Sequence, residues 1–229
     1  MTKPIFNFSI PELCQRADKL AISYKRDTES FKAYGYNGES LSNIETQTET
    51  LKQYPSDDYY EGKQKQATDV KNQLRATLET NISDLKNRTR LALGTKSMDY
   101  SLFKFSKLAS LNDNDLVQYS LHVVNIAQPI LDKLSSRLVT QEDLDTILSD
   151  RSKLDDAIDI QASAISERRI KKVERTKLAN ELYQLISELS EVGKIIWKEQ
   201  NEAYYTDYVI YGSAKAIVEQ EIEVEEEVD

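Results

Sequence analysis

The sequence is poor in the residues that most metal and nucleophile chemistry requires, with one cysteine and one histidine among 229 residues. Cys14 has no second cysteine with which to form an intramolecular disulfide. Structural zinc sites need several Cys or His ligands, and a di-iron site in a helical bundle needs two Glu-x-x-His motifs. The phosphate-binding patterns G-x-G-x-x-G and G-x-x-x-x-G-K-[ST] are absent, and His122 is interpreted as a structural or surface residue. We therefore predict no metal, no cofactor and no enzymatic activity.

Glycine and proline are scarce as well, at six and four residues. β-Sandwiches and barrels need many turns, so this composition argues against them. No stretch approaches the roughly 18 apolar residues that a membrane-spanning helix needs. The first residues, Met1–Leu13, lack the continuous apolar core of a secretory signal. These absences predict a cytoplasmic protein and argue against a membrane partner. The alternative is a mature secreted protein whose signal has been removed.

Acidic residues outnumber basic ones by 39 to 30, which gives a net charge of −9. The excess lies at the C-terminus, because the segment Ser213–Asp229 holds seven acids and one lysine. The remainder of the chain is nearly balanced and lacks the broad basic face that duplex DNA requires. The basic run between Arg168 and Lys177 is interpreted as a solvated helix face. We predict no nucleic-acid partner, and a disordered acidic tail over residues 212–229.

Apolar residues recur at spacings of three and four along nearly the whole chain, which is typical of amphipathic helices. The first helix is expected to begin after Ser9, whose side chain can cap it. Gly35 is expected to end this helix, and Pro55 to end the next one. A long helix follows, with an inward apolar face that runs from Val70 to Leu91. The fold class predicted is therefore all-α.

The second half of the sequence repeats the apolar pattern of the first half. The shift is 103 residues in the shorter helices and 104 in the long one, and it pairs Leu13 with Leu116, Ile44 with Ile147, Ile82 with Ile186 and Leu85 with Leu189. We predict two tandem copies of a three-helix unit, packed as an elongated helical bundle. The expected boundaries are an N-terminal segment at 1–8, a first repeat at 9–105, a second repeat at 112–211 and the acidic tail at 212–229.

The repeat makes two predictions about helix continuity. Because Pro55 separates two helices of the first copy, an equivalent break is expected near Asp155–Gln161. The three aspartates there are poor helix-interior residues and good caps, and they lack the spacing of a calcium-binding loop. Pro129 lies inside the fourth helix, where the counterpart in the first copy is Arg26. The second copy should therefore be kinked at this point and the first copy straight.

The sequence has thirteen tyrosines but only five phenylalanines and one tryptophan, and several of the tyrosines cluster at the end of the second copy. Tyrosine is enriched at protein interfaces. We predict that the candidate protein interface consists of Tyr204, Tyr205, Tyr208 and Tyr211. The alternative is that these rings seal the end of the bundle while their hydroxyls reach water. Trp197 is expected in the core rather than in a site.

The motifs G-K-I-I-W at Gly193–Trp197 and Y-Y-T-D-Y-V-I-Y at Tyr204–Tyr211 close the second copy. In them the chain resembles an uncharacterised bacterial family of duplicated helical-bundle proteins. The resemblance covers most of the chain and stops before the acidic tail. The family has no assigned activity, so the resemblance implies a helical fold and carries over no functional residue. A likeness to three-helix spectrin-type repeats concerns architecture only, because the middle helix here is too short.

Three classes of function are compatible with these observations. The one we favour is a non-enzymatic helical scaffold or interaction module that binds a protein partner or copies of itself. The alternative is a membrane-active, pore-forming type of helical protein, although no segment is apolar enough to insert as it stands. The third class is an enzyme with an unrecognised carboxylate or Ser/Lys site, which would need a deep polar pocket.

Overall fold

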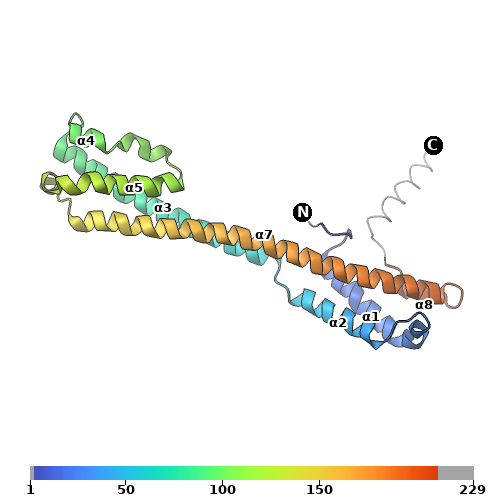
Figure 1. Cartoon of the computed structure of the whole chain (residues 1–229). Coiled ribbons are helices and arrows are strands. Elements are labelled where there is room, and N and C mark those ends of the chain that lie inside the picture. The colour runs from blue at the N-terminus through green and yellow to red at the C-terminus, as the bar shows by residue number, and fades with distance from the viewer. Residues whose placement is uncertain (1–2, 211–229) are drawn as a thin grey trace, which may run out of the picture. The chain divides into compact units, whose positions relative to one another are not determined.

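The structure is a computed structural model and describes residues 3–210 (Figure 1). All regular elements in this range are helices, which confirms the predicted all-α fold class. The described residues form two compact units, and the long helix α7 (Gln141–Trp197) contributes to both. Unit 1 comprises residues 3–57 and 169–210, and unit 2 comprises residues 58–168. Tyr211 and the predicted tail at 212–229 lie outside the described residues.

Unit 1 begins with α1 (Ile10–Lys32), which starts where the sequence predicts. The Oγ of Ser9 accepts a hydrogen bond from the backbone N–H of Glu12 at 3.3 Å, so one unpaired donor of the first turn is satisfied. The helix ends before a turn in which Gly35 has a φ of +86°, a conformation that glycine adopts at little cost. Helix α2 (Gly38–Gln53) then runs back along α1.

The core of unit 1 lies between α1, α2 and the C-terminal part of α7, and the residues that flank the short α8 (Glu202–Asp207) add to it. Figure 1 shows the helices of this unit. Helices α1, α2 and α7 supply apolar side chains spaced three or four residues apart, and burying one such side chain stabilises a fold by about 1.5–3 kcal/mol. Fully buried members include Leu13, Phe31, Ile44, Leu182, Ile186 and Leu189.

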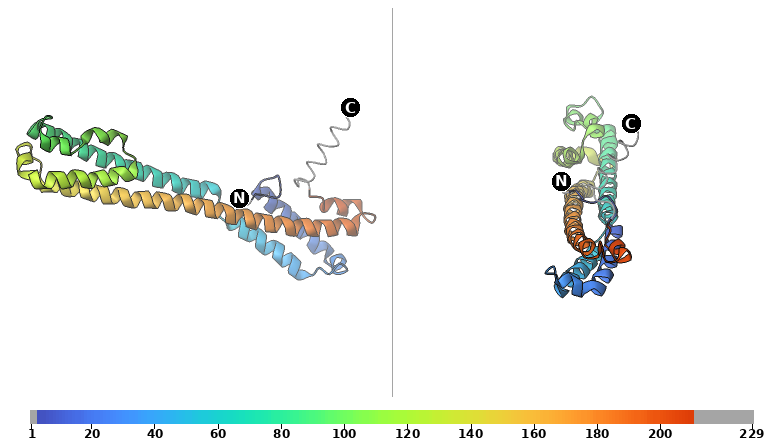
Figure 2. Two further views of the ribbon diagram at one scale, coloured as in Figure 1. Left: turned by 45° about the horizontal axis from the view of Figure 1, so that its top comes forward. Right: turned by 90° about the vertical axis from the view of Figure 1, so that its right-hand side faces the viewer.

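Unit 2 is built on α3 (Asp57–Leu93) and the N-terminal part of α7, which run antiparallel. Side-chain hydrogen bonds and ion pairs link Arg88 with Asp143, Asn81 with Asp150, and Thr68 with Gln161. Shorter elements complete the unit: α4 (Met98–Leu102), the 3₁₀ segment η1 (Phe105–Ser110), α5 (Asp113–Ala127), α6 (Leu131–Leu134) and the 3₁₀ segment η3 (Ser135–Arg137). Figure 2 shows α5 beside α3 and α7, and their facing apolar side chains form the core of this unit.

Pro129 interrupts the fourth predicted helix as expected. Helix α5 stops at Ala127, and the chain passes through the 3₁₀ segment η2 (Gln128–Ile130) before α6 begins. At the equivalent place in the first copy is Arg26, and α1 runs unbroken for 23 residues. The predicted contrast between the two helices is confirmed.

The predicted break near Asp155–Gln161 is wrong. Helix α7 runs through this stretch without interruption, so the fifth and sixth predicted helices are one helix of 57 residues. The three aspartates are exposed on its surface, whereas the neighbouring Leu154 and Ala157 are buried. An aspartate inside a helix costs only some tenths of a kcal/mol, and the buried apolar neighbours offset that cost.

The compact units do not follow the predicted repeat boundaries at 9–105 and 112–211. Unit 1 joins α1 and α2 to the C-terminal part of α7, and unit 2 joins α5 and α6 to α3. Each long helix therefore packs on the short helices of the other half of the sequence. Positions that the sequence shift pairs are buried alike: Leu13 and Leu116, Ile44 and Ile147, Ile82 and Ile186, Leu85 and Leu189. The duplication itself remains a prediction from the sequence.

Candidate protein interface

The predicted interface tyrosines begin on α8, which closes unit 1. Helix α8 is capped by Asn201, whose side-chain oxygen accepts hydrogen bonds from the N–H groups of Ala203 and Tyr204 at 3.1 and 3.2 Å. This cap turns the chain back after the end of α7 and brings α8 against α1. The tyrosines therefore face other elements of unit 1 as well as solvent.

Tyr208 is fully buried, so its assignment to the interface is wrong. Its hydroxyl donates a hydrogen bond of 2.7 Å to Oδ2 of Asp27, and its ring centroid lies 5.7 Å from that of Phe31. The ring also lies directly against the backbone of Gly193, where a Cβ atom would be 2.2 Å from the Cδ1 of Tyr208. A side chain held in this way belongs to the core of unit 1 and has no free face for a partner.

Asp27 is a buried carboxylate at the centre of a hydrogen-bond network. The guanidinium of Arg26 donates to both of its oxygens at 2.8 and 2.7 Å, and the indole N–H of Trp197 donates to Oδ2 at 3.0 Å. Burial by itself would raise the pKa of Asp27, but the hydrogen bonds from Arg26 and Tyr208 outweigh it and hold this pKa below its ordinary value. Burial, together with the bond to Asp27, raises the pKa of Tyr208. The network fixes the end of α7 and the end of α8 on α1.

Tyr204 also makes its contacts within unit 1. Its ring meets that of Trp197 edge to face at 4.8 Å between centroids, and the guanidinium carbon of Arg26 lies 3.7 Å above its face. Such aromatic and cation–π contacts are each worth about 0.5–1.5 kcal/mol. Tyr204 and Tyr205 are half-buried, and Tyr211 lies outside the described residues. The contacts of Tyr204 and Tyr208 favour the alternative that these rings seal the end of the unit, and Trp197 packs against its core as expected.

Sequence reasoning missed Asp27, although a signal for it was present. Leu20, Tyr24, Asp27 and Phe31 follow one another at spacings of four, three and four, so the acid lies on the apolar stripe of α1. An acid on a buried stripe indicates a paired charge, because an unpaired one would be too costly to bury.

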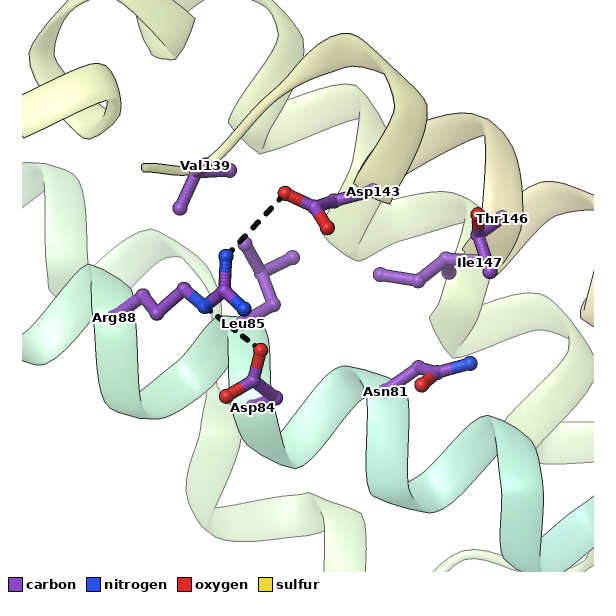
Figure 3. A pocket seen from close by; sticks show the side chains of 8 residues that line it. All are labelled: Asn81, Asp84, Leu85, Arg88, Val139, Asp143, Thr146 and Ile147. Carbon is purple, nitrogen blue, oxygen red and sulfur yellow. Dashed lines mark ion pairs between the residues drawn. The ribbon is translucent and has the colours of Figure 1, made fainter. Parts of the chain in front are cut away.

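Figure 3 shows a small pocket between α3 and α7 in unit 2. Arg88 lies beside it, with Nε 2.8 Å from Oδ2 of Asp84 and Nη1 3.6 Å from Oδ2 of Asp143. The same Nη1 donates a hydrogen bond of 2.9 Å to the carbonyl of Leu138. The pocket measures about 50 Å³, which is room for a few water molecules and well below the roughly 300 Å³ of small-molecule sites. Arg88 therefore joins the turn before α7 to α3 and leaves no space for a substrate there.

An open groove lies between α3 and α7 in unit 2, away from the part covered by α5 and α6. Ala67 and Val70 line it from α3, and Ile160 and Ala164 line it from α7. Val70, which the sequence predicts to point inward, is 52% exposed, and Ile160 is 61% exposed. Polar side chains also line the groove, namely Lys63, Gln66, Asp159, Ser163 and Glu167. An aliphatic centre with polar side chains around it, between two helices, is the form of surface that packs against further helices.

Candidate metal ligands do not come together in the described part of the chain. Among residues 3–210 there is no group of three His, Cys, Asp or Glu side chains that could hold a metal ion. His122 is half-buried, with Nε2 3.0 Å from the carbonyl oxygen of Leu102. The same range contains no helix with the length and apolar character needed to cross a membrane.

Comparisons with known proteins find no match to this chain among family models, curated proteins or solved structures. The resemblance of Gly193–Trp197 and Tyr204–Tyr211 to an uncharacterised bacterial family therefore stays a prediction.

Proposed function

We propose that this protein is a non-enzymatic helical scaffold that associates with a second copy of itself. The observation that carries the proposal is the aliphatic groove of unit 2, lined by Ala67, Val70, Ile160 and Ala164. Single exposed aliphatic side chains are ordinary on a protein surface, but several aliphatic side chains that line one groove between two helices resemble an unfilled packing seam. The proposal is also supported by the buried carboxylate of Asp27, which is committed to structural donors rather than free for acid–base chemistry.

A second copy fits the groove because the groove is self-complementary. A two-fold axis parallel to the groove would lay α3 of each copy on α7 of the other. Val70 would then face Ile160 of the second copy, and Lys63 would face Glu167 of the second copy. Within one chain Lys63 and Glu167 already form an ion pair of 3.6 Å at one end of the groove. Aliphatic residues would thus meet aliphatic residues, opposite charges would meet, and the four helices would form a local bundle.

Sedimentation velocity over a wide concentration range tests this proposal. The wild-type chain is expected to reach twice the monomer mass, whereas the double variant Val70→Glu/Ile160→Glu should remain monomeric at the same concentrations. Four carboxylates would face one another in its groove, and like charges on facing surfaces oppose association. Both native side chains are more than half exposed, so the circular dichroism and thermal unfolding of the variant should match the wild type.

Ile22→Glu is the matched control, because Ile22 is 72% exposed on α1 and belongs to unit 1, whereas the groove belongs to unit 2. This variant should dimerise like the wild type. The variant Val70→Lys/Ile160→Glu probes the two-fold geometry, since opposite charges would then face each other and the dimer should recover at low salt. A wild type that is monomeric at every concentration contradicts the proposal, and so does a Val70→Glu/Ile160→Glu variant that dimerises normally.

A further inference from the structure

The end of unit 2 where α3 turns into α4 carries a concentration of positive charge. Residues 86–107 contain six basic residues and one acid, in a chain whose net charge is −9. Arg90, Lys96 and Lys104 in this stretch are exposed and form no ion pair with any residue between 3 and 210. Free cations that are concentrated in this way favour an anionic ligand.

Exposed aliphatic side chains lie among these cations. Leu91 lies in the last turn of α3 and is 60% exposed, and Met98, the first residue of α4, is 79% exposed. Leu102 follows Met98 by four residues and so shares a face of α4 with it. We call this patch the 90–104 surface and define it by Arg90, Leu91, Lys96, Met98, Leu102 and Lys104.

Leu138 adjoins the 90–104 surface, because the side chain of Arg137 donates a hydrogen bond of 3.4 Å to the carbonyl of Leu91. The φ of Leu138 is 57°, which lies in the left-handed region that leucine rarely adopts, and its side chain is 78% exposed. Backbone conformations of this kind persist when the surroundings impose them, and they cluster at sites that bind ligands. Here the turn presents an aliphatic side chain to solvent beside a basic surface.

We propose that the C-terminal segment Ser213–Asp229 of a second copy docks on the 90–104 surface. This segment follows the described residues and carries seven acids and one lysine. In its sequence, Val218, Ile222 and Val224 alternate with glutamates, so it offers aliphatic groups and negative charge together. A nucleic acid would supply phosphates but no aliphatic side chains, so a peptide that is both acidic and aliphatic fits the surface better.

The inference rests on the proposed self-association and names a second contact for it. The groove joins the same patch on two copies, whereas the C-terminal segment and the 90–104 surface are different patches. A contact between different patches closes within a dimer when the two copies exchange their segments, and otherwise it links each copy to the next. In the second case, and at concentrations above those that complete the groove dimer, the two contacts together would extend the assembly beyond two copies.

The test is a charge exchange between two full-length variants, both built on Val70→Glu/Ile160→Glu so that the groove cannot contribute. One adds Arg90→Glu, Lys96→Glu and Lys104→Glu on the surface, and the other adds Glu219→Lys, Glu221→Lys and Glu223→Lys in the segment. By sedimentation velocity at low salt, and at concentrations above those that complete the groove dimer of the wild type, the parent should self-associate through the segment and the 90–104 surface. Each variant alone should do so at least about tenfold more weakly. An equimolar mixture should recover association, because an acidic surface then meets a basic segment on another molecule.

The matched control reverses three exposed lysines elsewhere, by Lys25→Glu, Lys172→Glu and Lys177→Glu, and should associate like the parent. A mixture that does not recover overturns the inference, as does a change in shape that is independent of concentration. Binding of the parent to phosphatidylserine vesicles that is lost on surface reversal but unaffected by segment reversal would assign the surface to lipid and also overturn it. Recovery in the mixture combined with a wild-type groove that does not dimerise would support this contact and reject the proposed groove.

Discussion

Gly193 lies on the buried face of α7, and the ring of Tyr208 occupies the space that a side chain would need. In Gly193→Ala the new Cβ would be 2.2 Å from the Cδ1 of Tyr208, so the ring must move away from its hydrogen bond with Asp27. Alanine favours a helix over glycine by about 1 kcal/mol, but overpacking costs about 1–3 kcal/mol and the lost bond about 1 kcal/mol more. We expect a net loss of about 1–3 kcal/mol in the free energy of unfolding, measured by urea denaturation followed by circular dichroism.

Gly62→Ala provides the control, because Gly62 is also helical and a Cβ there would have no neighbour within 4 Å. This variant should gain about 0.5–1 kcal/mol from helix propensity alone. If Gly193→Ala is as stable as the wild type, the ring of Tyr208 does not lie against Gly193 as described.

Helix periodicity predicted most of the helices, and capping and breaking residues predicted several of their ends, because both kinds of signal act locally. Ser9 begins α1 and Pro129 ends the helical run of α5 for reasons that the neighbouring residues supply. Periodicity identified an apolar face on α3, but it could not tell which part of that face another element covers. Val70 belongs to the same stripe as Leu78 and yet remains half exposed, because the core of unit 2 ends before it reaches Val70. The sequence also could not tell whether the tyrosines at α8 are covered within the unit or exposed to a partner, since an amphipathic ring suits both a core and an interface.

Helix α7 offers a test of whether its aspartates are interior residues or caps. Asp156 is exposed in the middle of the helix, and its substitution by alanine should raise the free energy of unfolding by about 0.5 kcal/mol through helix propensity. If Asp156 capped a separate helix, Asp156→Ala would instead lower stability by about 1 kcal/mol. Asn112→Ala is the comparison, because Asn112 caps α5 through a hydrogen bond of 2.9 Å from the N–H of Asp115. Urea denaturation of both variants should show opposite signs.

At the level of the whole molecule, the sequence shift could not reveal which short helices pack on which long helix. Positions that the shift pairs have nearly the same apolar side chains, as at Ile82 and Ile186. The short helices of one half could therefore bury the long helix of either half in an equivalent core. Helix α7 decides between the two arrangements, because it remains continuous where the tandem arrangement requires a turn. The compact units then combine residues from both halves of the chain.

Because each compact unit combines residues from both halves of the sequence, the behaviour of the chain after a cut between the halves can be predicted. A protease recognition sequence inserted after Ser110, at the exposed end of η1, would allow cleavage into residues 1–110 and 111–229. Because the core of unit 1 joins Leu13 to Leu189 and that of unit 2 joins Leu116 to Leu85, the two pieces should elute together by size-exclusion chromatography. They should separate only in denaturant, whereas two self-contained tandem repeats would part as soon as the chain is cut. The uncut insertion variant, which should unfold like the wild type, shows that the insertion itself is tolerated.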